Sequence, residues 1–131
     1  MTIVHWKTKY SSAFDESYAS MATISWGVRS QAHIWSPPTD LFENENHYVV
    51  RVEIAGMHKN AFEINIEDNF LIIKGKRTEP TGKKAFHQME VRFGEFSSIV
   101  EIPGSVDESK AEAEYHDGFL TVILPKFTIF E

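Results

Sequence analysis

Lys74 to Thr78, reading KGKRT, is the segment that comes nearest to a phosphate-binding loop in this 131-residue chain. The phosphate loop requires G-x-x-x-x-G-K-[ST], in which backbone amides and the lysine hold the phosphates. Here both the first glycine and the hydroxyl residue directly after the lysine are missing. We therefore expect no nucleotide site.

Other reactive side chains do not form a catalytic or metal-binding pattern. The six histidines, at positions 5, 33, 47, 58, 87 and 116, show no H-E-x-x-H and no close pair at ligand spacing, so we expect surface or loop residues. Glu114, His116 and Asp117 could be imagined as an acid–base set, but Glu114 and His116 flank a tight turn where polar residues are expected anyway. There is also no G-x-S-x-G elbow for a nucleophilic serine. We expect no enzyme, no metal and no cofactor.

The charge is distributed unevenly along the chain. Residues 1–36 carry three basic and two acidic residues, whereas the remainder carries ten basic and seventeen acidic ones. The short basic clusters of the remainder are diluted by acidic residues and are expected to be solvated strand ends or loops (Lys74, Lys76 and Arg77; Lys83 and Lys84). Without a basic face to neutralise phosphates, a nucleic-acid partner is not expected.

Length and composition indicate one domain with appendages. The chain has no cysteine, which excludes disulfides and thiolate chemistry and fits a reducing compartment. No segment reaches the roughly 18 apolar residues of a membrane-spanning helix, and the N-terminus lacks the order of a signal peptide. We expect a cytoplasmic protein without a membrane partner.

A boundary is predicted at Ser36-Pro37-Pro38, because two prolines disfavour both helix and sheet. Residues 1–36 are interpreted as an aromatic-rich arm, partly helical or disordered, which holds all three tryptophans. Four aromatic residues recur every four positions and would form one helical stripe (Trp6, Tyr10, Phe14 and Tyr18). Such a short helix is marginal alone, so the stripe should pack on its own domain, a neighbouring subunit or a foreign chain.

Beyond the prolines, the hydrophobic period changes from 3.6 to 2. Strands are predicted where apolar residues alternate or β-branched residues cluster, over residues 48–54, 62–66, 70–76, 96–102, 111–115 and 119–124. Asp68-Asn69 and Asp117-Gly118 provide turns, and Pro125 ends the last strand. Six or more short strands with no helix between them predict an all-β, immunoglobulin-like antiparallel sandwich of two sheets.

The interval from Arg77 to Glu95 is long for a hairpin connection. It contains a strand-like piece, Ala85 to Met89, without an obvious local partner. Such a segment can add to the exposed sheet edge of another subunit. We therefore expect a strand-exchanged homodimer, or a larger homo-oligomer, that depends on the loop residues Phe86, His87, Gln88, Met89 and Glu90.

The order of short motifs from residue 37 to 126 resembles the α-crystallin domain of small heat shock proteins, in its bacterial and plant branch. The closing segment AEYHDGFLTVILPK carries most of this resemblance, with Ala113, Gly118, Leu120 and Leu124-Pro125-Lys126 at the family's spacing. Further matches are Pro38 with Asp40-Leu41-Phe42, VEIAG (52–56), LIIKGK (71–76), RFGEF (92–96) and Ile102-Pro103.

Two positions depart from the family pattern. The family commonly has an arginine where this chain has Ser98. The family's C-terminal extension ends in two branched apolar residues, one apart, that fill a groove on a neighbouring domain, whereas here only FTIFE (127–131) follows Lys126. Phe127 and Ile129 have the required spacing, and we expect them to reach only a close neighbour.

The resemblance implies an ATP-independent holdase that binds partly unfolded client proteins and prevents their aggregation. The expected client-binding residues are the aromatic residues of the arm (Trp6, Tyr10, Phe14, Tyr18, Trp26 and Trp35). We assign the docking groove to two strands (Val50, Val52, Ile54, Leu120, Val122 and Leu124). The alternative is a co-chaperone or adaptor sandwich that recognises one folded partner, since this architecture serves both functions.

Overall fold

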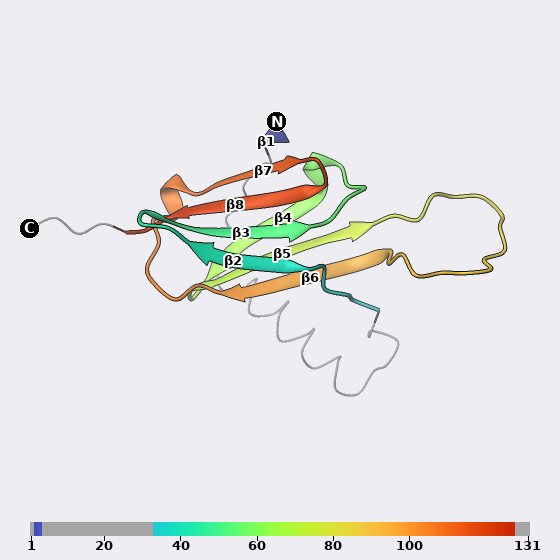
Figure 1. Cartoon of the computed structure of the whole chain (residues 1–131), viewed down its shortest axis with the longest axis horizontal. Coiled ribbons are helices and arrows are strands. Elements are labelled where there is room, and N and C mark those ends of the chain that lie inside the picture. The colour runs from blue at the N-terminus through green and yellow to red at the C-terminus, as the bar shows by residue number, and fades with distance from the viewer. Residues whose placement is uncertain (1, 4–32, 128–131) are drawn as a thin grey trace, which may run out of the picture.

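The computed structural model describes residues 2–3 and 33–127, and the described strands form a two-layered sandwich (Figure 1). One sheet has five strands in the order β1-β7-β8-β3-β2, and the other has three in the order β4-β5-β6. All neighbouring strands are antiparallel. The strands are β1 (Thr2–Ile3), β2 (Thr39–Glu43), β3 (His47–Glu53), β4 (Phe62–Glu67), β5 (Phe70–Arg77), β6 (Gly94–Glu101), β7 (Glu112–His116) and β8 (Phe119–Pro125).

The predicted all-β antiparallel sandwich is confirmed, and the six predicted strands correspond to β3 through β8. The sequence interpretation missed β2, a five-residue strand that follows the two prolines and pairs with β3. It also missed β1, which lies in the predicted arm and pairs with β7. Two short 3-10 turns, Lys59–Ala61 and Glu108–Lys110, complete the described elements.

The two tightest hairpins use the predicted turn residues. Asp68 and Asn69 both have positive φ, at 51° and 70°, and they join β4 to β5. Asp117 and Gly118, at 52° and 83°, join β7 to β8 in the same way. Two consecutive residues with positive φ give the turn whose twist matches that of the flanking strands. These turns therefore fix the registers Glu67↔Phe70 and His116↔Phe119.

The core lies between the two sheets and is mostly aliphatic. Alternate residues of β3, β4, β5 and β8 point inward and are fully or almost fully buried. A row of aromatic rings crosses this core: Trp35 contacts Phe96, Phe96 contacts Phe62, and Phe62 contacts Tyr115. The centroid distances are 5.8, 6.3 and 5.1 Å, with the tilted or edge-to-face geometry that aromatic pairs prefer.

This aromatic row identifies which sheet edges lie over each other. Phe62 of β4 contacts Tyr115 of β7, so these two strands stack on one side of the sandwich. On the other side, the Thr39 hydroxyl of β2 lies 2.7 Å from the Ser98 hydroxyl of β6. Within the part of the chain that the structure describes, no helix is long and apolar enough to cross a membrane.

Candidate functional site

The long loop between β5 and β6, residues 78–93, extends away from the sandwich (Figure 1). Every residue from Thr81 to Arg92 is exposed. Phe86, Met89 and Val91 expose 52%, 65% and 62% of their surface, unusual values for large apolar side chains. The loop therefore presents an apolar surface that the described parts of its own chain leave uncovered.

The strand-like piece predicted at Ala85 to Met89 does not form a strand in this single chain. A strand needs a hydrogen-bonding neighbour, and none of the strands described here lies beside this segment. Phe86, His87, Gln88, Met89 and Glu90 lie together in the loop, and Gln88 donates a hydrogen bond to Glu90. Their role in dimerisation stays a prediction, and Val91 adds an exposed apolar residue that the sequence interpretation left out.

Arg77 ties the two ends of the long loop together. Its Nε and Nη2 both donate to the carbonyl of Arg92, at 2.9 and 2.5 Å, and its Nη1 donates to the carbonyl of Ala55 at 3.1 Å. The guanidinium also lies 4.8 Å from the ring centroid of Trp35 and 5.4 Å from that of Phe93. The expectation that Arg77 is merely solvated is therefore wrong, because its planar fork reaches several acceptors at once.

The outer edge of β2 is the candidate acceptor for a foreign strand. This strand pairs with β3 on one side and ends the five-stranded sheet on the other. A shallow depression beside it is lined by Thr39, Asp40, Leu41, Phe42 and Arg51. Arg51 donates to Asp40 at 2.8 Å and lies over the Phe42 ring, so one charged pair and one aromatic ring flank the open edge. An unpaired edge with apolar side chains is a site for strand addition.

Ser98 occupies the position at which the related family commonly has an arginine. The side chain is buried where β2 lies over β6. The hydroxyl of Thr39 donates to the carbonyl of Pro37 at 2.9 Å, so the 2.7 Å contact between the two hydroxyls is donated by Ser98. A neutral hydrogen bond therefore joins the two sheets at this position.

The residues assigned to a docking groove form the core instead. All six have no exposed surface and lie in the buried cluster between the sheets (Val50, Val52, Ile54, Leu120, Val122 and Leu124). The assignment is wrong because alternate residues of central strands face the other sheet and are inaccessible to a docked segment. Their alternation is evident from the sequence, but which strands lie at the edges of the sheets is not.

Trp35 also requires a correction. It is 8% exposed and belongs to the core, and its backbone exchanges hydrogen bonds with Glu95 and Ser97 of β6. It is therefore unavailable for client binding in this conformation, and the folded part begins before Ser36. The other five predicted client-binding residues lie outside the described residues, as does Ile129 (Trp6, Tyr10, Phe14, Tyr18 and Trp26).

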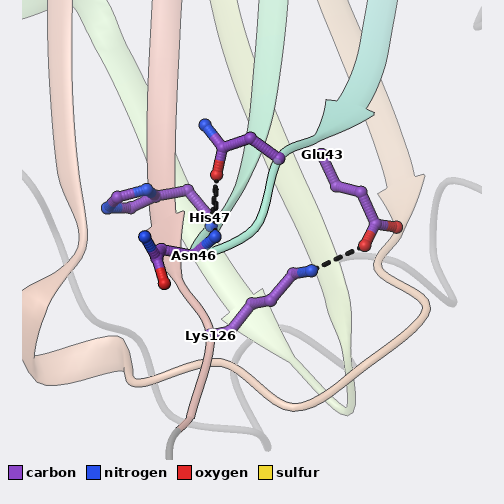
Figure 2. A network of polar contacts seen from close by, with 5 residues as sticks. Glu43, Asn46, His47 and Lys126 are labelled. Atoms are coloured by element: carbon purple, nitrogen blue, oxygen red, sulfur yellow. Dashed lines mark hydrogen bonds and ion pairs between the residues drawn. The ribbon is translucent and has the colours of Figure 1, made fainter.

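The beginning of the C-terminal tail is attached to the sandwich. The amides of Lys126 and Phe127 donate to the carbonyls of Asn46 and Ser105, at 2.8 and 3.1 Å. Figure 2 shows the Lys126 ammonium beside the Glu43 carboxylate, and the two groups are 2.6 Å apart. This hydrogen bond raises the pKa of Lys126 above its usual value. Phe127 itself is largely exposed.

The turn beneath this attachment has its own stabilising hydrogen bonds. The Asn44 side chain accepts from the amides of Asn46 and His47, at 2.9 and 2.8 Å, and these bonds shape the connection between β2 and β3. Figure 2 shows this turn next to Lys126. The tail therefore leaves the fold in a direction fixed by two neighbouring loops.

Among the described residues, no group of three or more histidine or acidic side chains could hold a metal ion. His116 contacts Asp117 at 3.1 Å, but both side chains are exposed at the β7–β8 turn.

Comparisons with known proteins agree with this architecture. The sequence model of the Hsp20/alpha crystallin family matches residues 40–129 of this chain. Small heat shock protein C4 of Rickettsia felis is 34% identical over 115 residues, which cover 86% of this chain and 71% of that protein. The 17.7 kDa class II heat shock protein of Arabidopsis thaliana is 35% identical over 104 residues, covering 76% and 66% of the two chains.

Solved structures show the same fold. Heat shock protein 16.0 from Schizosaccharomyces pombe superposes with a TM-score of 0.64 and 30% identity, covering 73% of this chain and 94% of that one. A small heat-shock protein from Xylella fastidiosa gives a TM-score of 0.66 at 26% identity, covering 74% and 91%. The sandwich is thus an α-crystallin domain. The chain belongs to the Hsp20/alpha crystallin family of small heat shock proteins.

Proposed function

We propose that this protein is an ATP-independent holdase, which binds partly unfolded proteins through apolar surface and prevents their aggregation. Membership of a family of heat shock proteins carries this proposal. The exposed apolar residues of the long loop and the aromatic composition of the arm support it, because a holdase needs apolar surface that it can offer to a client. Burial of apolar area, at about 25 cal/mol per Å², would give affinity with little sequence specificity.

The proposed functional unit is a strand-exchanged homodimer. In it, residues 86–90 of one copy would pair with the open edge of β2 in the second copy. The 16 residues of the loop can reach about 50 Å when extended, which is enough to cross to a neighbouring sandwich. The added strand would continue to Val91, so that Met89 and Val91, two residues apart, point to the same side, toward one apolar surface.

Deletion of residues 78–90 tests this dimer. Sedimentation should show a dimer or larger oligomer for the full chain and a folded monomer for the deletion variant. A deletion variant that remained fully dimeric would exclude exchange through the loop. The circular dichroism spectrum would serve as the control for folding.

The proposed capture surface is the arm, with Trp6, Tyr10, Phe14, Tyr18 and Trp26 contacting clients. In a proposed assembly larger than the dimer, Phe127 and Ile129 would dock on a close neighbour. The attachment of Lys126 and Phe127 supports this tail proposal, because it fixes where the tail starts.

Recovery of a soluble complex tests client capture. A thermally labile client heated with the full chain, without ATP, should elute with it in a complex of high molecular mass on size-exclusion chromatography. The same client kept folded at low temperature should elute alone. Binding to the folded client but not to the heated one would contradict the holdase proposal and favour the adaptor alternative.

A further inference from the structure

The outward face of the five-stranded sheet carries a row of apolar side chains. Residues that face each other across antiparallel strands lie on the same side of a sheet, and the register places Phe42 of β2, Val49 of β3 and Ile123 of β8 next to one another. Their neighbours along each strand pack in or against the core, so this row points away from it. Phe42 is 43% exposed, and Val49 and Ile123 are half-buried. The solvated face of an antiparallel sheet is normally polar, so this row requires an explanation.

Acidic residues surround the apolar row. Glu112 pairs with Ile123, and Glu53 pairs with Phe119, which is 41% exposed on the same face. Register rows are about 7 Å apart, less than the Debye length of about 8 Å at physiological ionic strength, so charges in neighbouring rows act together. The outward positions of β2, β3, β7 and β8 hold four acidic residues and one arginine (Asp40, Glu53, Glu112, Glu114 and Arg51).

Arg51 shows how a cation binds to this face. Its guanidinium donates to the Asp40 carboxylate at 2.8 Å and lies 5.0 Å from the centroid of the Phe42 ring. A carboxylate and an aromatic ring therefore hold one guanidinium together, through a charge-assisted hydrogen bond and cation–π attraction.

A second pair of the same chemistry lies two register rows away. Glu53 and Phe119 face each other across β3 and β8, and both side chains are exposed. Within the part of the chain that the structure describes, no cation lies over the Phe119 ring and no ion pair involves Glu53. This pair can therefore accept a lysine or arginine from another chain.

We propose that this face binds basic, apolar segments of partly unfolded proteins, an inference that rests on the proposed holdase function. A lysine or arginine of the client lies on Phe119 and Glu53, and its apolar stem adds contact while its charged end reaches the carboxylate. An apolar side chain of the client lies on Val49 and Ile123. Phe119 and Ile123 are four residues apart, about 13 Å along the strand, so an extended client that runs along β8 uses residues four apart on one of its sides.

Charge distinguishes this occupant from a second copy of the chain. Residues 37–131 carry ten basic and seventeen acidic residues, so the sandwich of a second copy would be repelled by an acidic face. A basic segment is attracted to the same face, and its apolar residues gain stability by covering the row.

Peptide binding to the full chain tests the proposed site. The probe is a labelled synthetic peptide with leucine and lysine four residues apart in a serine and glycine background. The comparison peptide has glutamate in place of each lysine. In fluorescence anisotropy the lysine peptide should bind at least about tenfold more tightly, and added salt should reduce this difference. Equal affinities of the two peptides would overturn the proposal.

Charge variants locate the binding. Glu53→Gln with Glu112→Gln should weaken binding of the lysine peptide at least about fivefold. The matched control, Glu95→Gln with Glu101→Gln, removes the same charge from exposed positions of β6 in the other sheet and should change binding less than about twofold. Equal effects of the two double variants would overturn the proposal, because the peptide would then respond only to net charge.

Apolar variants give a second measurement. Ile123→Ser should weaken binding of the lysine peptide about fivefold, because apolar contact is lost. The matched control is Ile99→Ser, which removes the same side chain from an exposed position of β6 and should leave binding unchanged. Circular dichroism should establish that both variants are folded, and the charge variants test the site independently of this. Equal effects of the two serine variants would contradict the proposal.

Sedimentation of Ile123→Ser tests a second copy as the occupant. A smaller assembly in this variant would show that the face joins two copies and would overturn the proposal, whereas an unchanged assembly supports a client segment. Peptide binding is measured without an aggregating client, so the two proposals fail separately. Suppressed aggregation without the peptide preference would remove only the assignment of this face, and peptide preference without suppression would contradict only the holdase proposal.

Discussion

Gly75 lies directly between two core aromatic residues, and replacing it with alanine should destabilise the sandwich. It pairs with Phe62 on one side and Phe96 on the other. A Cβ atom at this position would lie 2.6 Å from the ring carbon Cζ of Phe96 and 3.0 Å from the backbone carbonyl of Ala61. Because contacts below 3.0 Å are forbidden in practice, the Phe96 ring would have to move within a closely packed core.

The cost of Gly75→Ala should be about 2 kcal/mol, within the range of about 1–3 kcal/mol for adding a methyl group to a packed core. For a domain of this size, that loss corresponds to a decrease in Tm of about 10 °C. The smaller unfolded-state entropy of alanine offsets the loss by under about 1 kcal/mol. Thermal unfolding by circular dichroism, at one fixed protein concentration, measures the change.

Combining Gly75→Ala with Phe96→Leu separates this clash from a general effect of alanine. Phe96→Leu alone should destabilise through a cavity by about 1–2 kcal/mol. The double variant should lose at least about 1 kcal/mol less than the sum of the single variants, because the smaller side chain makes room for the methyl group. Additive losses, or a Gly75→Ala variant as stable as the original protein, would show that a clash with Phe96 does not destabilise the sandwich.

Three further predictions concern the long loop, its anchor Arg77 and the Tyr115 hydroxyl. The double variant Met89→Ser, Val91→Ser should raise the dissociation constant of the dimer, measured by sedimentation, at least about tenfold, because two buried apolar contacts would be lost. Lys83→Ser in the same loop is the control and should leave the dissociation constant unchanged. Equal effects of the two changes would contradict strand exchange through the loop. Arg77→Ala should speed proteolysis of residues 78–93 several-fold. Arg77→Lys should restore little of the protection, because an ammonium cannot bridge the same carbonyls. Full protection in the lysine variant would show that the positive charge alone suffices. Tyr115→Phe should lower the free energy of unfolding in urea by about 1 kcal/mol, because the Tyr115 hydroxyl donates to the carbonyl of Ile54 and accepts from the amide of Met57. An unchanged unfolding midpoint would mean that these hydrogen bonds contribute no net stability.

The strands could be predicted from sequence because their local signals agree with the fold. Alternation identifies β3 and β8, and the turn residues at Asp68-Asn69 and Asp117-Gly118 occur where positive φ is needed. β2 was missed because its alternation is weak: Asp40, Phe42 and Glu43 are exposed, and Leu41 is half-buried. An edge strand contributes few core side chains, and its position is set by pairing with β3.

The interaction surfaces were harder to predict, because they depend on which strands become neighbours. Val50 and Leu120 have the pattern of an apolar surface, but stacking of the two sheets turns that surface into the core. Trp35 looked like part of the arm because it precedes two prolines, whereas its burial depends on Phe96, sixty-one positions away in the sequence. Arg77 resembled a solvated residue because its partners at Ala55 and Arg92 are set by tertiary structure.

The long loop was predictable in length and exposure but not in conformation. The loop is recognisable in the sequence because a polar segment separates the apolar runs that form β5 and β6. Its conformation in a dimer depends on a second chain, since an extended segment becomes a strand only when a neighbouring strand provides hydrogen bonds.

Aggregation of a heat-denatured client, followed by light scattering without ATP, tests the holdase proposal most directly. Two chains should be compared with a buffer control: the full chain, and a variant that begins at Ile34 and so retains the core residue Trp35. Circular dichroism should first establish that the shortened variant is folded. The full chain should suppress scattering, and the shortened variant should suppress it much less. Scattering that the full chain leaves unchanged would contradict the holdase proposal, and equal suppression by both chains would exclude the arm as the capture surface.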